Sequence, residues 1–107
     1  MKLVLAIVSN DDSSAVSSSL THEGFQVTKL ATTGGFLLKG NTTFLIGVAD
    51  EKVVQVIEII SRRSNKRTQI VPSTTSMDMG MYSSFPVEVT VGGSTIFVLN
   101  VERYEKG

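Results

Sequence analysis

Residues 25–48 read FQVTKLATTGGFLLKGNTTFLIGV. Apolar and β-branched residues at the two ends of this stretch predict two strands, over residues 25–30 and 43–48. The connection between them is far longer than a simple hairpin needs. We therefore expect two strands joined by a long, glycine-rich loop.

The segment before this pair predicts a strand followed by a helix. Residues 3–8 are continuously apolar, which is typical of a buried central strand. Residues 11–13 (Asp-Asp-Ser) offer side-chain oxygens that could cap a helix, and Gly24 is a stop signal just beyond His22. We expect that helix to end at about His22.

The segment after the pair predicts a second helix and a long loop. Asp50 is a candidate cap for a helix whose apolar residues recur at helical spacing: Val53, Val56, Ile57 and Ile60. A short extended piece over residues 69–71 is expected next. Residues 72–85 are rich in Ser, Thr and Met, which favours a long loop of functional character.

The last segment carries a hairpin pattern. Apolar residues alternate over residues 85–91, Gly92-Gly93 follows, and residues 95–101 are again apolar and β-branched. The predicted order is β-α-β-β-α, then a loop and a closing β-hairpin. The first five elements and one returning strand make a ferredoxin-like arrangement. The predicted fold class is thus α+β, with an added β-hairpin, in one domain over residues 1–107.

Composition excludes several classes of function. Ten basic and ten acidic residues give no net charge, which argues against a general nucleic-acid binder. The chain has no cysteine, so disulfides, cysteine-based metal sites and thiol chemistry are excluded. The first apolar run is too short for a secretory signal or a membrane span, so we expect a cytoplasmic protein without membrane attachment.

The charges are unevenly distributed. Residues 24–49 contain Lys29 and Lys39 but no carboxylate. Residues 59–77 contain four bases, again without a carboxylate: Arg62, Arg63, Lys66 and Arg67. Two acid-free, mildly basic stretches in a neutral chain suit a small anionic ligand, although chance clustering on solvated faces explains them equally well.

The loop between the two strands has features of a nucleotide site. Gly34 and Gly35 permit positive φ and close approach of the backbone, whose N–H groups can form an anion-binding nest. Phe36 and Leu37 could sandwich a flat base. Asn41 has a donor and an acceptor that match the Hoogsteen edge of adenine. A structural loop, in which the two apolar residues cover the core or a subunit interface, is the alternative.

Two strings carry a family resemblance, TKLATTGGFL over residues 28–37 and GNTTFLIGV over residues 40–48. They closely resemble the cyclic-di-AMP receptor proteins of the PII-like family (DarA/PstA type). Further matching strings lie at both ends of the chain, so the resemblance covers nearly all of it. It implies a homotrimer of ferredoxin-like subunits that binds one cyclic dinucleotide in each cleft between neighbours.

The resemblance also implies a set of ligand-binding positions: Gln26, Thr28, Gly34, Gly35, Phe36, Leu37, Asn41 and Gly47. In this assignment Thr28 and the two loop glycines hold the phosphate and sugar, and the Phe-Leu pair packs on adenine. Asn41 reads the base edge, and Gly47 supplies backbone contact and space. Gln26 departs from the family, which more often has Arg there; Lys29 or a base of the neighbouring subunit is expected to compensate.

The expected function follows from these residues. We expect a receptor that binds cyclic-di-AMP and relays its presence to a downstream protein through loop rearrangement, with no catalysis, metal or cofactor. A PII-like sensor of ATP or ADP is the alternative. An acid pair, Asp11 and Asp12, also admits a phosphohydrolase, although acids at a helix start are ordinarily explained by the helix dipole.

Overall fold

The computed structural model describes residues 1–30, 40–72 and 86–107. Its elements, in chain order, are β1 (Lys2–Ser9), α1 (Asn10–His22), β2 (Thr28–Leu30), β3 (Asn41–Val48), a 3₁₀ turn η1 (Asp50–Lys52), α2 (Val53–Arg63), β4 (Arg67–Pro72), β5 (Pro86–Val91) and β6 (Ser94–Asn100). Within these ranges, no helix is long and apolar enough to cross a membrane.

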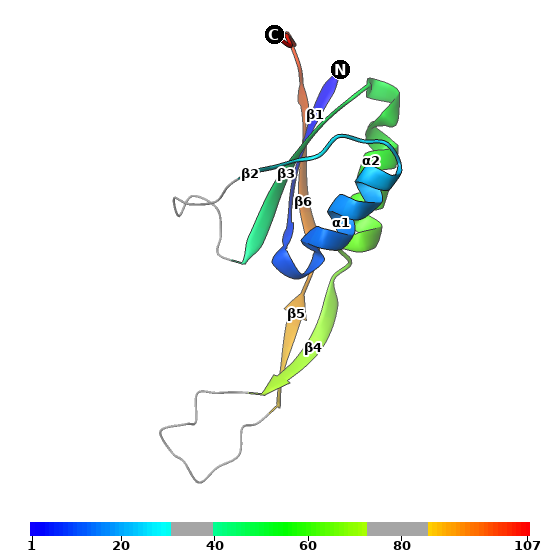
Figure 1. The fold of residues 1–107 in the computed structure, drawn as a ribbon. Coiled ribbons are helices and arrows are strands. Elements are labelled where there is room, and N and C mark those ends of the chain that lie inside the picture. The colour runs from blue at the N-terminus through cyan, green and yellow to red at the C-terminus, as the bar shows by residue number, and fades with distance from the viewer. Residues whose placement is uncertain (31–39, 73–85) are drawn as a thin grey trace.

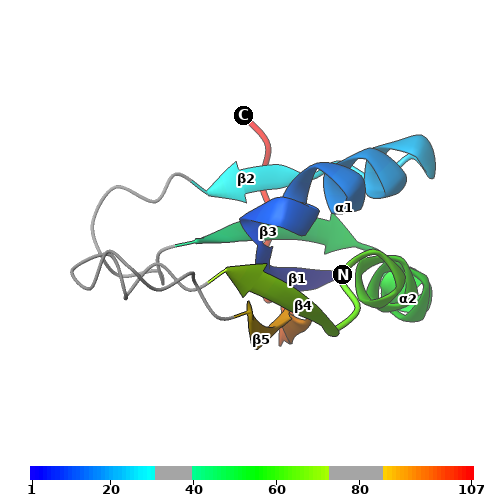
Figure 2. The same cartoon turned by 90° about the horizontal axis from the view of Figure 1, so that it is seen from below.

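Four of the strands form one antiparallel sheet in the order β2-β3-β1-β6. Both helices lie on the same face of this sheet, as the view from below shows (Figure 2). This confirms the predicted α+β class. The strand order is consistent with a ferredoxin-like fold in which β6 is the fourth strand.

The hydrophobic core lies between that sheet face and the helices. Alternate residues of β1 and β3 point toward the helices and are buried, whereas the residues between them face the other way. The core consists of Val4, Ala6, Val8, Val16, Leu20, Phe44, Ile46, Val48, Val56, Ile59 and Ile60. In the described part of the chain, neither helix covers the opposite face of the sheet, which is called the open face below (Figure 2).

The starts of both helices differ from the prediction. Ser9 is the N-cap of α1, and its hydroxyl accepts a hydrogen bond from the backbone N–H of Asp11 at 3.3 Å. Residues 11–13 therefore lie inside the first turn of the helix, where Asp11 and Asp12 are stabilised by the positive end of the helix dipole. Asp50 does not cap α2, because it begins the 3₁₀ turn; Lys52 is the N-cap of α2 and makes no side-chain capping bond. Gly24, with φ +90°, lies just beyond α1 as predicted.

The predicted hairpin between residues 85–91 and 95–101 is wrong. β5 pairs instead with β4, and β6 pairs with β1 along the main sheet. Figure 1 shows β5 and β6 following one another in the same direction. Gly92 and Gly93 both have positive φ, and the Gly93 N–H donates to the carbonyl of Ser64. The glycine pair therefore connects two ladders rather than reversing the chain.

Close packing explains why glycines occupy this connection. A Cβ at Gly92 would collide with the carbonyl oxygen of Asn65, and one at Gly93 would lie 2.9 Å from Cγ of Lys66. The connection thus lies directly against the residues that leave α2. A side chain at Gly92 would force the two segments apart, and one at Gly93 would displace the Lys66 side chain.

An ion pair fixes the start of β4 against α1. Asp12 is 6% exposed, and the guanidinium of Arg67 donates to both of its carboxylate oxygens, at 2.9 and 3.3 Å. The same guanidinium also donates to the carbonyl of Asn65 at 3.1 Å. The β4–β5 ladder, which extends beyond the end of the main sheet (Figure 1), is therefore anchored at its base.

Candidate functional site

Strand register places three of the predicted ligand residues on the open face. Thr28 pairs with Leu45, and Leu45 in turn pairs with Leu5. Directly paired residues share a sheet face, as do residues two apart along a strand. Asn41 and Gly47, at even spacing from Leu45, therefore lie on the same face as Thr28, away from the helices.

These three residues occupy different levels of the open face. Asn41 begins β3 opposite Ser9, while Gly47 lies near the other end of that strand, opposite Leu3. Six residues of extended chain separate them, which corresponds to about 20 Å. Thr28, at the level of Leu45, is closer to Gly47 than to Asn41. One subunit therefore does not bring Asn41 and Gly47 onto the same base.

Gly47 provides room rather than an unusual backbone conformation. It is exposed, and a Cβ built on it would lie 3.1 Å from Cε of Met1. A larger side chain would thus have to displace the half-exposed Met1 methyl group. The role of Gly47 in making room for a ligand stays a prediction.

The start of the second strand was predicted too early, and this affects Gln26. β2 begins at Thr28, and Gln26 lies in the extended segment between α1 and β2. Its neighbours Phe25 and Val27 pack against the core, while Gln26 is exposed. An exposed Gln26 is compatible with contact to a ligand or to a neighbouring subunit.

Lys29 lies on the wrong face to compensate for Gln26 within its own subunit. It pairs with Phe44, whose side chain is in the core, so Lys29 points to the helix side of the sheet. There it lines a small cavity together with Ser13 and Ser17 of α1. The expectation that Lys29 neutralises a phosphate beside Thr28 is therefore not supported by the register.

Four predicted ligand residues cannot be placed. Gly34, Gly35, Phe36 and Leu37 lie outside the described residues. Their assignment stays a prediction. Asn41, which was predicted as part of the same loop, is instead the first residue of β3.

The open face also contains a contiguous apolar surface. It is formed by the apolar residues at odd positions of β1 and by the apolar residues paired with them: Leu3, Leu5, Ile7, Leu45, Phe97 and Leu99. Phe97 is 53% exposed and Leu99 is 44% exposed. An exposed apolar surface of this kind is typical of a protein–protein interface.

Thr43 is a polar residue on this face that sequence reasoning did not single out. It lies between Asn41 and Leu45 along β3 and is 1% exposed. Across the described ranges, its hydroxyl is the buried side-chain group without a hydrogen-bond partner. A threonine within a buried, apolar strand pattern is the only sequence signal that could have indicated it.

Replacement of Thr43 by Val is expected to raise the free energy of unfolding by about 1 kcal/mol, because it removes an unpaired buried hydroxyl at nearly constant shape. Thr42→Val is the matched control, since the hydroxyl of the equally buried Thr42 donates to Oδ1 of Asn10. That control is expected to lose stability. Urea denaturation of the ligand-free protein measures both, and equal losses would contradict the assignment of Thr43 as unpaired.

The fold and the site define a class of protein. A small α+β domain presents glycine, amide and hydroxyl positions beside an apolar face, which is the chemistry of a ligand-binding module. No group of three or more His, Cys, Asp or Glu residues in the described part is arranged to hold a metal ion. Asp12, a residue of the candidate acid pair, forms an ion pair with Arg67.

Comparison with known proteins identifies the family. The model of the cyclic-di-AMP receptor family matches residues 1–107, so the chain belongs to that family. The chain is also similar to the crystal structure of a functionally unknown protein from Pediococcus pentosaceus, with 40% sequence identity and a TM-score of 0.74. That alignment covers 99% of this chain and 96% of the other. Family membership supports cyclic-di-AMP binding and signalling rather than catalysis.

Proposed function

We propose that this protein is a cytoplasmic, PII-like signalling protein that binds cyclic-di-AMP at the interfaces of a homotrimer and relays the signal to a protein partner. The observation that carries the proposal is the placement of Thr28, Asn41 and Gly47 on the open face, with Asn41 and Gly47 about 20 Å apart along β3. Family membership supplies the identity of the ligand.

The spacing of these residues favours a site shared between subunits. Asn41 and Gly47 of one subunit are too far apart to hold one base together. If a second copy packed on the open face, the Asn41 end of one subunit would approach the Gly47 end of its neighbour. Repeated around a threefold axis, this contact between unlike surfaces closes into a ring.

The apolar surface supplies a reason for assembly. When a neighbouring subunit covers residues such as Leu5 and Phe97, exclusion of water stabilises the assembly by roughly 25 cal/mol for each Å² of apolar surface covered. β2 is an edge strand of the main sheet, so Thr28 lies near the boundary where a neighbour would be reached. A ligand bound at that boundary would contact both subunits.

Among the described residues, neither Gln26 nor Lys29 supplies a positive charge beside Thr28 on the open face. Gln26 carries no charge, and Lys29 lies on the helix side of the sheet. We therefore propose that a base of the neighbouring subunit faces the phosphate. On the resemblance alone, we further propose that Gly34, Gly35, Phe36 and Leu37 contact the ligand and that segments 31–39 and 73–85 carry the response to the partner.

Substitution of Asn41 by Ala tests the proposed base contact. We expect cyclic-di-AMP affinity to fall by about tenfold to a hundredfold, because a well-placed amide–base pair contributes roughly 1–3 kcal/mol of recognition. Isothermal titration calorimetry of both proteins measures the change. Asn65→Ala is the matched control, since Asn65 is exposed and lies beyond the end of α2.

The control variant is expected to bind as the unaltered protein does. Equal affinities for Asn41→Ala and the unaltered protein would contradict the role of Asn41. A thermal-shift competition with ATP separates the two ligand hypotheses, because displacement of cyclic-di-AMP by ATP at comparable concentration would favour an ATP or ADP sensor.

A further inference from the structure

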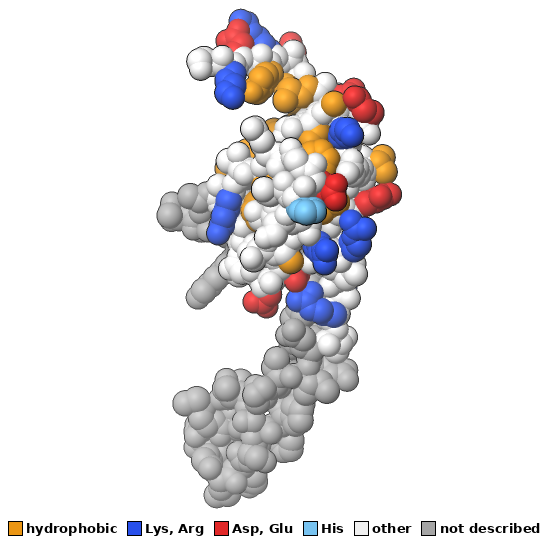
Figure 3. Space-filling view, turned by 45° about the vertical axis from the view of Figure 1, so that its right-hand side comes forward, with side chains coloured by type: hydrophobic (Ala, Val, Ile, Leu, Met, Phe, Trp, Pro, Cys, Tyr) orange, Lys and Arg blue, Asp and Glu red, His pale blue; other side chains and the backbone are white. Residues whose placement is uncertain are grey.

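The basic residues that follow one another at the end of α2 have different surroundings. Arg67 is paired with Asp12, and the side chain of Lys66 lies against Gly93. Arg62 and Arg63 are exposed, and the described residues place no carboxylate within 4.0 Å of either. Figure 3 shows the Lys and Arg side chains gathered over this end of the helix.

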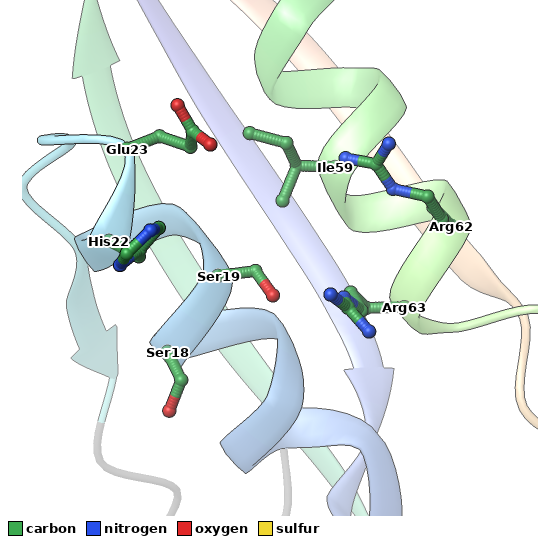
Figure 4. Close-up of a pocket in the computed structure, with 7 residues that line it drawn as sticks. All are labelled: Ser18, Ser19, His22, Glu23, Ile59, Arg62 and Arg63. Atoms are coloured by element: carbon green, nitrogen blue, oxygen red, sulfur yellow. The ribbon is translucent and has the colours of Figure 1, made fainter.

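Arg62 and Arg63 line a groove between the two helices. The groove has a volume of about 330 Å³, and α1 contributes Ser18, Ser19 and His22 to its lining. Figure 4 shows these side chains on neighbouring helices, with those of Ser19 and Arg63 directed toward one another. The buried side chain of Ile59 also lines it.

The lining chemistry suits an anion. The two guanidinium groups present forked N–H donors that match phosphate oxygens, and the hydroxyl of Ser19 adds a donor from the facing helix (Figure 4). His22 can add a donor or a charge. Glu23 is the one carboxylate in the lining, so the two arginines leave the groove with a positive balance.

The helix dipole alone does not account for this arrangement. A cation at the end of α2 is stabilised by the negative end of that helix. The dipole of α1 likewise accounts for His22 in its last turn, but neither dipole accounts for the Ser19 hydroxyl directed toward Arg63. The concave shape and small volume also favour a small molecule over a protein segment, which needs a wider surface.

We propose that the groove between α1 and α2 binds a small phosphorylated anion through Arg62, Arg63 and the hydroxyl of Ser19. This site is separate from the proposed cyclic-di-AMP site, because Thr28, Asn41 and Gly47 lie on the opposite face of the sheet. It does not depend on the proposed function and stands if cyclic-di-AMP fails to bind.

Inorganic pyrophosphate is the probe for this site. We expect its addition to the full chain, in buffer free of phosphate and sulfate, to shift the backbone amide NMR signals of residues 18–23 and 59–63. Chloride at matched ionic strength is expected to leave those signals in place. Arg62→Gln and Arg63→Gln are each expected to weaken pyrophosphate binding by about tenfold, as loss of a charge-assisted contact predicts.

Two variants with the same loss of charge serve as controls. Lys66→Gln and Arg103→Gln remove one positive charge outside the groove and are expected to change pyrophosphate affinity less than twofold. Equal weakening by all four variants would overturn the proposal, since it would show general attraction to a basic surface. Signal changes spread over the open face, or displacement of pyrophosphate by cyclic-di-AMP, would overturn it as well.

A phosphoserine peptide provides the remaining comparison. If such a peptide binds the groove far more tightly than pyrophosphate does, the occupant is a protein segment and the proposal of a small anion is wrong. Thermal melting of each variant confirms that the exposed substitutions leave the fold intact.

Discussion

Replacement of Leu5 by Asp is expected to leave the subunit folded but to abolish both assembly and cyclic-di-AMP binding. Leu5 lies on the central strand β1, paired with Leu45 on one side and Phe97 on the other, in the middle of the apolar surface. A carboxylate there would be buried without a partner when subunits meet, which is strongly unfavourable. Light scattering after size-exclusion chromatography measures the mass, and calorimetry measures the binding.

Val54→Asp is the matched control for this prediction. Val54 is an apolar residue of α2 that is 66% exposed, and it lies on the helix side of the sheet. This variant is expected to assemble and to bind as the unaltered protein does. A Leu5→Asp variant that retains the trimer mass and the ligand would contradict the proposal that the open face is the assembly surface.

Replacement of Asp12 by Asn is expected to lower the free energy of unfolding by about 1–3 kcal/mol. The guanidinium of Arg67 keeps its charge in this variant but loses the carboxylate that accepts two of its hydrogen bonds. Loss of one partner from a buried ion pair is costly, and the partial exposure of Arg67 moderates the loss here. Urea denaturation measures the change.

Asp11→Asn separates this ion pair from the effect of the helix dipole. Asp11 is exposed in the same turn of α1 and makes no ion pair with a described residue. Asp11 shares the dipole effect but not the contact with Arg67, so we expect this variant to lower the free energy of unfolding by only about a few tenths of a kcal/mol. Equal losses in the two variants would show that Arg67 contributes nothing specific.

Local patterns predicted the elements of the main sheet well. The apolar run of β1 and the helical spacing in α2 each reflect burial of one surface against the core, which a short window of sequence reveals. The pairing of β5 was predicted wrongly. Alternating apolar residues on both sides of Gly92-Gly93 are equally compatible with a hairpin and with two successive strands that pair with different partners. Contacts with distant residues such as Asn65 decide between these two arrangements.

The candidate site was predicted less completely than the fold. That Thr28, Asn41 and Gly47 share a face follows only from the register between β2 and β3, which the sequence does not specify. The same register places Lys29 on the other face, against expectation. The ion pair between Asp12 and Arg67 was not anticipated either, because 55 positions separate its members in the chain.

Titration of the unaltered protein with cyclic-di-AMP in an isothermal calorimeter tests the central claim most directly. We expect saturable binding with about one ligand per subunit and a dissociation constant of about micromolar or below. We also expect that ATP does not displace the ligand at comparable concentration. Absence of heat at protein concentrations of tens of micromolar would contradict the account.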